Sequence, residues 1–193
     1  MARPCRRSQW HQLFRAGSVI LLSVGTQLPF DRLVSAVDRW AAQRDRDDIV
    51  GQVGPATYQP TKIKTFPFVD HDAFRKLQSE ATLMISHAGM GSIITAMELG
   101  IPIIILARDH RLGEHRNGHQ MATLRRFRHH PGVFAAEDEA HLAQLLDRAD
   151  TLSASPQLTA EAPESFIAML NGYIEQPLPA SRLSLVQRWL RGA

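Results

Sequence analysis

The stretch TLMISHAGMGSIITAMELGIPIIILARDHRLGEHRNGHQ, residues Thr82–Gln120, decides the fold of this chain. Two apolar runs, Leu83–Ser86 and Ile101–Ala107, have the length of buried parallel strands, and a pattern with helical spacing separates them. Gly100-Ile101-Pro102 ends that helix and starts the second strand. The stretch therefore predicts a βαβ unit.

A glycine-rich turn, Ser86–Ser92, follows the first of these strands. Its glycines allow the backbone to pass close to a ligand. A helix that starts near Ser92 would direct unpaired N–H groups and the positive end of its dipole toward the turn, which suits a phosphate or pyrophosphate. We predict that the backbone at Gly89, Met90, Gly91 and Ser92 binds such a group.

The loop after the second strand, Glu114–Gln120, has the highest density of hydrogen-bonding groups in the chain. Ligands of open α/β sheets bind outside the carboxyl ends of the strands, so this loop and the glycine-rich turn should face one crevice. The alternative interpretation is a solvated helix N-terminus capped by Asn117. Zinc binding by His115 and His119 is a further alternative, but no third ligand is evident.

These motifs together resemble glycosyltransferase family 28. HAGMGS (His87–Ser92), a helix, Gly-x-Pro, a strand and a loop that closes in His119-Gln120 are similar to the donor half of these enzymes. VGTQLPFD (Val24–Asp31) resembles the start of short catalytic subunits in the family, and the similarity covers about Val19–Ala149. The resemblance implies the donor half of a GT-B glycosyltransferase that binds a UDP-sugar.

The resemblance also implies roles for individual residues. Gly25 and Thr26 follow the first strand and would line the nucleotide cleft, although a plain strand-to-helix turn explains them equally well. Thr95 stands where relatives carry a glutamate thought to hold the ribose, and Glu98 is the nearest acidic residue on that helix. The sugar-binding residues implied by the closing loop are Glu114, Arg116, Asn117, His119 and Gln120.

His87 is the candidate catalytic residue. A neutral imidazole near pH 7 can accept a proton from an acceptor hydroxyl. The resemblance instead favours a contact with the donor, with the base on the acceptor half. A structural role beside the turn is the remaining alternative.

The rest of the chain extends the βαβ unit to a doubly wound, mostly parallel, Rossmann-like α/β sheet. Apolar runs predict strands at Val19–Val24, Ile49–Val53, Ile63–Val69 and Gly132–Ala135. Helices are predicted from Asp31 as N-cap, from Asp70 or Asp72 as N-cap, over Asn117–Phe127 and over Asp138–Ala149.

Charge and composition divide the chain into three predicted parts: a basic N-terminal extension (1–18), the nucleotide-sugar-binding domain (19–150), and a linker with C-terminal helices (151–193). The net charge is +3, and residues 1–18 contribute four arginines and no acid. The remainder is therefore almost neutral, which excludes a broad nucleic-acid surface. The basic segments at both ends leave peripheral membrane contact as an alternative to solvation.

A single cysteine, Cys5, excludes an internal disulfide and fits a reducing compartment. No apolar run reaches the length of a membrane span, so we expect a cytoplasmic protein, with peripheral contact at the inner face of the plasma membrane as an option. No Asp-x-Asp stands in a suitable loop, which predicts a metal-independent reaction without a cofactor.

We therefore predict an inverting hexosyltransferase subunit that transfers a sugar from a UDP-sugar to a lipid-linked acceptor in polysaccharide or glycolipid synthesis, such as exopolysaccharide biosynthesis. The chain is short for a two-domain glycosyltransferase, so the acceptor half and membrane anchor are expected on a second polypeptide in a heteromeric complex. One alternative is a nucleotide-sugar-binding subunit without catalysis. A dinucleotide-binding oxidoreductase is less favoured because no G-x-G-x-x-G follows the first strand.

Overall fold

The computed structural model describes residues 19–158 together with residues 164, 167, 168 and 171. Residues 19–158 contain a six-stranded sheet with the order β3-β2-β1-β4-β5-β6. All neighbouring strands in it pair in parallel. This order is that of the dinucleotide-binding Rossmann fold, and it confirms the predicted doubly wound sheet.

The strands occupy the predicted apolar runs, with ends that differ by a few residues. β5 is buried along its whole length and β1 likewise, which explains why their runs lack the alternation of a half-exposed strand. β3 is shorter than predicted because Pro67 cannot donate to a strand ladder. The strands are β1 (Ile20–Ser23), β2 (Ile49–Gln52), β3 (Lys64–Phe66), β4 (Leu83–His87), β5 (Ile103–Leu106) and β6 (Val133–Ala136).

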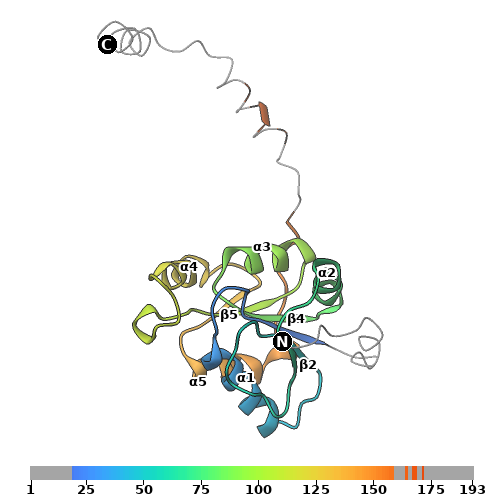
Figure 1. Cartoon of the computed structure of the whole chain (residues 1–193). Helices are drawn as coiled ribbons and strands as arrows, with labels where there is room; N and C mark the ends of the chain where they lie inside the picture. Colours follow the sequence, from blue (N-terminus) through green and yellow to red (C-terminus); the bar gives the residue numbers. More distant parts are fainter. Residues whose placement is uncertain (1–18, 159–163, 165–166, 169–170, 172–193) are drawn as a thin grey trace, which may run out of the picture. The chain divides into compact units, whose positions relative to one another are not determined.

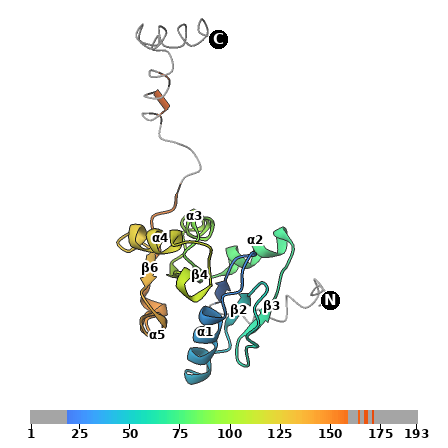
Figure 2. The same cartoon turned by 60° about the vertical axis from the view of Figure 1, so that its left-hand side comes forward.

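Helices cover both faces of the sheet (Figure 1). The five α-helices of this domain are α1 (Asp31–Gln43), α2 (His71–Glu80), α3 (Met90–Leu99), α4 (His119–Phe127) and α5 (Glu139–Leu146). One core cluster joins α1 and α5 to the sheet, and a second joins α2, α3 and α4 to the opposite face. Figure 2 shows the same two layers from another side.

Helix starts are where the sequence predictions fail most often. Asp31 is not an N-cap: α1 begins at Asp31 itself, whose carboxylate accepts the backbone N–H of Thr57 at 2.9 Å. α3 begins at Met90, two residues before the predicted start near Ser92. Asn117 does not cap α4, because Gly118 occupies the N-cap position.

The predicted cap at Asp70 is confirmed, and Asp138, the first residue of a predicted helix, is also a cap. The Asp70 carboxylate accepts the N–H of Ala73 at the start of α2, and the Asp138 carboxylate accepts the N–H of His141 at the start of α5. Gly100 ends α3 with φ of 65°, a left-handed conformation that glycine adopts without strain. The helix of the βαβ unit therefore ends at Gly100, as predicted.

The topology places three loops at one edge of the sheet. β1 lies between β2 and β4. The chain therefore builds β2 and β3 on one side of β1 and then crosses to build β4, β5 and β6 on its other side. Ser23 at the end of β1 pairs with Ser86 of β4, and His87 pairs with Leu106 at the end of β5. The segments that follow β1, β4 and β5 therefore start side by side at the switch point of the sheet.

Across residues 19–158 and the four described residues beyond them, no helix is long and apolar enough to cross a membrane. The predicted extension 1–18 lies outside the described residues, as does most of the predicted linker with C-terminal helices, 151–193.

Candidate functional site

A cleft of about 410 Å³ opens where the chain leaves β1, β4 and β5. Its walls come from the turn after β1, the turn after β4, the loop after β5 and the first turns of α4. The lining residues are Val24, Gly25, Thr26, Gln27, Leu28, His87, Ala88, Gly89, Met90, Arg108, His115, His119, Gln120 and Thr123. This position is the one that parallel α/β sheets use for ligands.

The structure brings about half of the predicted site residues together in this cleft. Those that line it are Gly25, Thr26, His87, Gly89, Met90, His119 and Gln120. Those that do not line it are Gly91, Ser92 and Thr95 on α3, and Glu114, Arg116 and Asn117 in the loop after β5. Glu98 is exposed on α3 and does not line it either.

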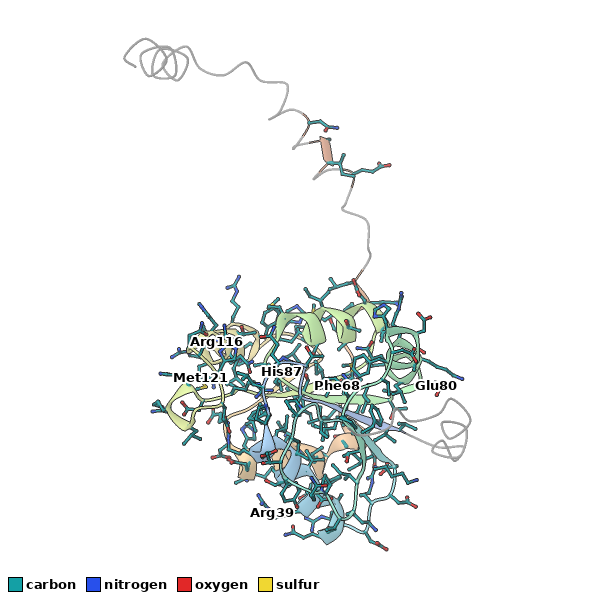
Figure 3. The ribbon with its side chains drawn as sticks, in the orientation of Figure 1. Arg39, Phe68, Glu80, His87, Arg116 and Met121 are labelled. Atoms are coloured by element: carbon teal, nitrogen blue, oxygen red, sulfur yellow. The ribbon has the colours of Figure 1, made fainter. Side chains whose placement is uncertain are left out.

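His87 lines the cleft and lies between the two glycine turns that carry Gly25 and Gly89; its position on the ribbon is labelled in Figure 3. Gly25 has φ of 81°, and a Cβ added there would lie 3.0 Å from the imidazole Cε1. A Cβ on Gly89 would overlap with Nε2 of the same ring. The imidazole therefore fills the space that side chains at these turns would need.

The hydrogen bonds of His87 indicate its tautomer. The Ser86 hydroxyl donates to the Ser23 carbonyl at 2.9 Å, and its Oγ lies 3.2 Å from His87 Nδ1. Because the hydroxyl hydrogen is already used, Oγ accepts from Nδ1–H, and Nε2 carries no proton. This leaves Nε2 as the acceptor on the side of Gly89.

Burial lowers the pKa of His87 to about 4, with a further contribution from the positive charge of Arg108. The imidazole is therefore neutral at physiological pH. It is also a weak base, because a low pKa reduces its affinity for a proton. The geometry thus favours His87 as a packing and contact residue of the cleft.

Glu114, predicted to contact the sugar, is held within the protein. Its carboxylate accepts from Arg32 Nε at 2.8 Å and Nη2 at 2.9 Å, and from the backbone N–H of Asp109 at 2.8 Å. Only 12% of its side chain is exposed. The Arg32–Glu114 pair therefore joins α1 to the loop after β5.

Gln120 has a fixed orientation in the cleft wall. It is 8% exposed, and its Oε1 accepts the backbone N–H of Arg108 at 3.1 Å. This bond distinguishes the two ends of the amide, since Nε2 can only donate. The side chain therefore presents an NH₂ group as the donor for a ligand.

Sequence reasoning missed Arg108, which lies two residues after β5 and lines the cleft. It also missed Thr123 on α4. The available signal for Arg108 was its place directly after an apolar strand at the carboxyl edge of the sheet. In the part of the chain that the structure describes, no group of three histidine, cysteine or acidic side chains is arranged to hold a metal ion.

The strand order and the cleft at the switch point define a Rossmann-like class of α/β domain. Residues 19–165 match the glycosyltransferase family 28 C-terminal domain. The chain belongs to this family. No curated protein sequence matches the chain.

Solved structures share the fold. The chain is similar to the NMR solution structure of ALG13, with 19% identity and a TM-score of 0.54 over 76% of this chain and 92% of that one. The chain is also similar to UDP-GlcNAc 2-epimerase from Neisseria meningitidis bound to UDP-GlcNAc, with 13% identity and a TM-score of 0.52 over 75% of this chain and 39% of that one. For the glycosyltransferase of kitacinnamycin the identity is 19% and the TM-score is 0.50, over 81% of this chain and 40% of that one.

At these identities the similarity concerns the fold. The chain spans about two fifths of the epimerase and of the kitacinnamycin enzyme. The predicted fold class, the donor half of a GT-B glycosyltransferase, is confirmed.

Proposed function

We propose that this chain binds a UDP-sugar in the cleft and transfers a hexose-type sugar from it to a lipid-linked acceptor. The observation that carries the proposal is the meeting of two glycine turns around His87, next to the oriented amide of Gln120. Membership of glycosyltransferase family 28 supports sugar transfer as the reaction. The fold it shares with a UDP-GlcNAc-bound epimerase supports the choice of UDP.

The diphosphate of the donor lies at the start of α3 in this proposal. Gly89 is the N-cap, and no side chain caps the helix. The first amides of α3, at Met90, Gly91 and Ser92, are therefore the donors for negative charge that builds on the leaving UDP. They fulfil the role that a metal ion has in other transferases, and the acceptor attacks the anomeric carbon opposite to the UDP, with inversion.

The sugar lies toward α4. Gln120 and His119 line that wall of the cleft and supply an NH₂ group and an imidazole to sugar hydroxyls. Arg116 and Asn117 are exposed in the preceding loop, where they contact the outer part of the sugar. Thr95 is half-buried further along α3 and does not line the cleft, so the proposal assigns it no contact with the ribose.

The acceptor half comes from a second, membrane-anchored polypeptide. Exposed apolar side chains follow three strands at the carboxyl edge: Phe68 after β3, Met90 after β4 and Leu112 after β5, with exposed fractions of 45%, 44% and 63%. Such side chains around an open polar cleft are typical of an interaction surface. Closure by a partner would exclude water and strengthen the electrostatic stabilisation of the leaving group.

His87 contacts the donor in this mechanism, and the catalytic base belongs to the acceptor half. The reason is the low pKa of the His87 imidazole, about 4, which makes it a poor proton acceptor. The site of transfer is cytoplasmic, at a membrane that supplies the lipid-linked acceptor.

The test is a titration of the isolated chain with UDP, GDP, ADP and NADH, repeated with Gly91→Asp and Gln120→Ala. A Cβ on Gly91 would meet no heavy atom within 4 Å, so Gly91→Asp should fold normally. Its carboxylate at the start of α3 should repel the diphosphate. Ser79→Asp on exposed α2 is the matched control.

We expect selective binding of UDP, lost in Gly91→Asp and retained in Ser79→Asp. Binding of NADH without UDP would instead support the oxidoreductase alternative. The second candidate function, a non-catalytic binding subunit, predicts the same titrations but no sugar transfer when an acceptor-half subunit is added.

A further inference from the structure

Arg108 places a buried cation at the cleft. It is 3% exposed and lines the cleft. Its Nη2 donates to the carbonyls of Val24 at 2.6 Å and Leu28 at 2.8 Å. Its Nη1 donates to the carbonyls of Pro29 at 2.5 Å and Glu114 at 3.3 Å. All four Nη hydrogens are thus directed to main-chain oxygens.

These bonds join separate walls of the cleft. Val24, Leu28 and Pro29 belong to the segment between β1 and α1, while Glu114 belongs to the loop after β5. The backbone N–H of Arg108 also holds Gln120 at the start of α4. One residue therefore sets the distance between the turn that carries Gly25 and Thr26 and the wall that carries Gln120.

The charge of Arg108 has no ion-pair partner. Within residues 19–158 no carboxylate lies within ion-pair distance of its guanidinium, because the Glu114 carboxylate is bound to Arg32. The Phe30 ring lies 4.6 Å from Cζ and covers one side. Burial lowers the pKa of Arg108 to about 10, so the group stays charged at neutral pH. The Glu114 carboxylate attracts this charge and acts to raise its pKa, but it is bound to Arg32. The direct contacts of the guanidinium are neutral carbonyls and a ring, so a positive potential remains in the cleft.

We propose that Arg108 is a positioning residue for the diphosphate of the donor: it fixes two walls of the cleft and supplies the positive charge beneath the diphosphate. The proposal rests on the proposed function, because it takes a nucleoside diphosphate as the ligand. A purely structural arginine would have its charge neutralised by a carboxylate in direct contact, and Arg108 has no such contact. The specific consequence is a preference for UDP over uridine that depends on this charge.

The experiment measures the dissociation constants of UDP and uridine for the wild type, Arg108→Met, Arg108→Lys and Arg125→Met. Arg125 is exposed on α4 and does not line the cleft, so Arg125→Met is the matched control. We expect Arg108→Met to weaken UDP binding by about tenfold or more and uridine binding by less than about threefold. Arg108→Lys, which keeps the charge, should restore most of the preference for UDP.

A spectroscopic readout reports the charge independently of ligand. Besides burial, the groups that act on the His87 imidazole are Arg108 and His115, which lower its pKa, and the Ser23 backbone, which raises it. The Ser86 hydroxyl contacts Nδ1. The NMR titration of the His87 Cε1–H signal should therefore move to higher pH in Arg108→Met. It should stay at low pH in Arg108→Lys and in Arg125→Met. This titration shows whether the charge of Arg108 acts inside the cleft, and the comparison of UDP with uridine shows whether it acts on the diphosphate.

Equal loss of UDP and uridine affinity in Arg108→Met, or no loss of either, would overturn the proposal. If Arg108→Met does not fold, Arg108→Lys decides: a preference for UDP that falls by tenfold despite the retained charge contradicts the proposal. Failure of the proposed function has a different signature, since the wild type would then bind no UDP at all. The two results are therefore distinguishable.

Discussion

Gly89 lies against the imidazole of His87 so closely that a Cβ on Gly89 would overlap with Nε2. Gly91, two residues further on, has open space around the same position. The two glycines of the HAGMGS turn thus have different roles. Gly89 is required by a packing contact within the chain, whereas the space at Gly91 is available to a ligand.

This difference predicts the effects of alanine at the two sites. Gly89 has φ of −92°, which alanine adopts freely, so the effect of Gly89→Ala is steric. We expect it to lower the free energy of unfolding by about 1–3 kcal/mol, as overpacking does. Gly91→Ala should raise it by up to about 1 kcal/mol, because alanine favours a helix. Urea denaturation of both variants measures the two values, and equal stabilities would contradict the packing role of Gly89.

The Arg32–Glu114 pair gives a second prediction. The pair is partly buried, with side-chain exposures of 21% and 12%, and Glu114 raises the pKa of Arg32 through its hydrogen bonds. Glu114→Gln and Arg32→Met should each lower the free energy of unfolding by about 1–2 kcal/mol. The double variant should lose less than the sum, because either single change already breaks the pair. Arg32 keeps one counter-charge in Glu114→Gln, since Glu139 lies 3.5 Å from its Nη1.

Glu80→Gln is the control for this pair. Glu80 pairs with Lys76 at 3.7 Å on exposed α2, and such a pair contributes about 0.3–0.5 kcal/mol. Titration of Glu114→Gln with UDP-N-acetylglucosamine separates the two roles of Glu114. A large loss of affinity at unchanged stability would favour the direct sugar contact that the sequence predicted over the ion pair.

The low pKa of His87 predicts a pH dependence of stability. The pKa is about 4 in the folded chain and 6.5 for an unperturbed histidine. As the pH falls from about 6.5 to about 4, the unfolded chain binds a proton that the folded chain does not, so the free energy of unfolding decreases. The contribution of His87 to the free energy of unfolding is fully present above about pH 6.5. It decreases as the pH falls, and the decrease ends below about pH 4.

Between about pH 7 and pH 5 the expected loss is about 2 kcal/mol. His87→Gln should abolish that part of the pH dependence. The carboxylates with lowered pKa, such as Asp109 with a pKa of about 2, lose their contribution only at lower pH. Urea denaturation of the wild type and His87→Gln at both pH values measures the difference, and parallel pH profiles would refute the assignment.

The sequence sufficed for the order of strands and helices because the central strands are almost entirely apolar. Ile103–Leu106 is buried on both sides, and a run of this kind has few other places in a fold. Helix ends were less predictable because they depend on distant contacts. Asp31 had the sequence pattern of a cap, but its carboxylate holds Thr57, 26 residues further along the chain.

Asp38 shows the same limit inside a helix. Its position in α1 suggests nothing unusual, yet it is 2% exposed and accepts the backbone N–H groups of Lys62 and Ile63. Burial acts to raise the pKa of Asp38, but these backbone hydrogen bonds outweigh it and hold the pKa low. The contact orders the approach to β3, and no local pattern reveals it.

The residues of the candidate site likewise fall into those in local motifs, which the sequence predicted, and those held by distant contacts, which it did not. Gly25, Gly89 and His87 were found because turns and short motifs are local features of the sequence. The contacts of Arg108 with Val24 and Leu28 span about 80 residues of chain, and those of Glu114 with Arg32 span 82. Partners at such separations cannot be read from spacing. The sequence thus located the cleft but not the charges that hold its walls.

Gln120 provides the last prediction, because its two amide atoms have separate roles. Oε1 accepts the N–H of Arg108 and anchors the side chain, while Nε2 is the proposed donor to the sugar. Gln120→Glu retains an acceptor for Arg108 and removes the donor. We therefore expect its free energy of unfolding to change by less than about 1 kcal/mol at neutral pH. Gln120→Met, which removes both groups, should lose about 1–2 kcal/mol because the Arg108 N–H is left unpaired.

The ligand measurement compares UDP-N-acetylglucosamine and UDP-glucose with UDP for each variant. If Nε2 donates to the sugar, the ratio of UDP-sugar to UDP affinity should fall by about 3- to 10-fold in both variants. The ratio cancels any repulsion between the new carboxylate and the diphosphate, because both ligands carry that group. An unchanged ratio would place the sugar away from α4 and would reassign this wall of the cleft to the nucleotide.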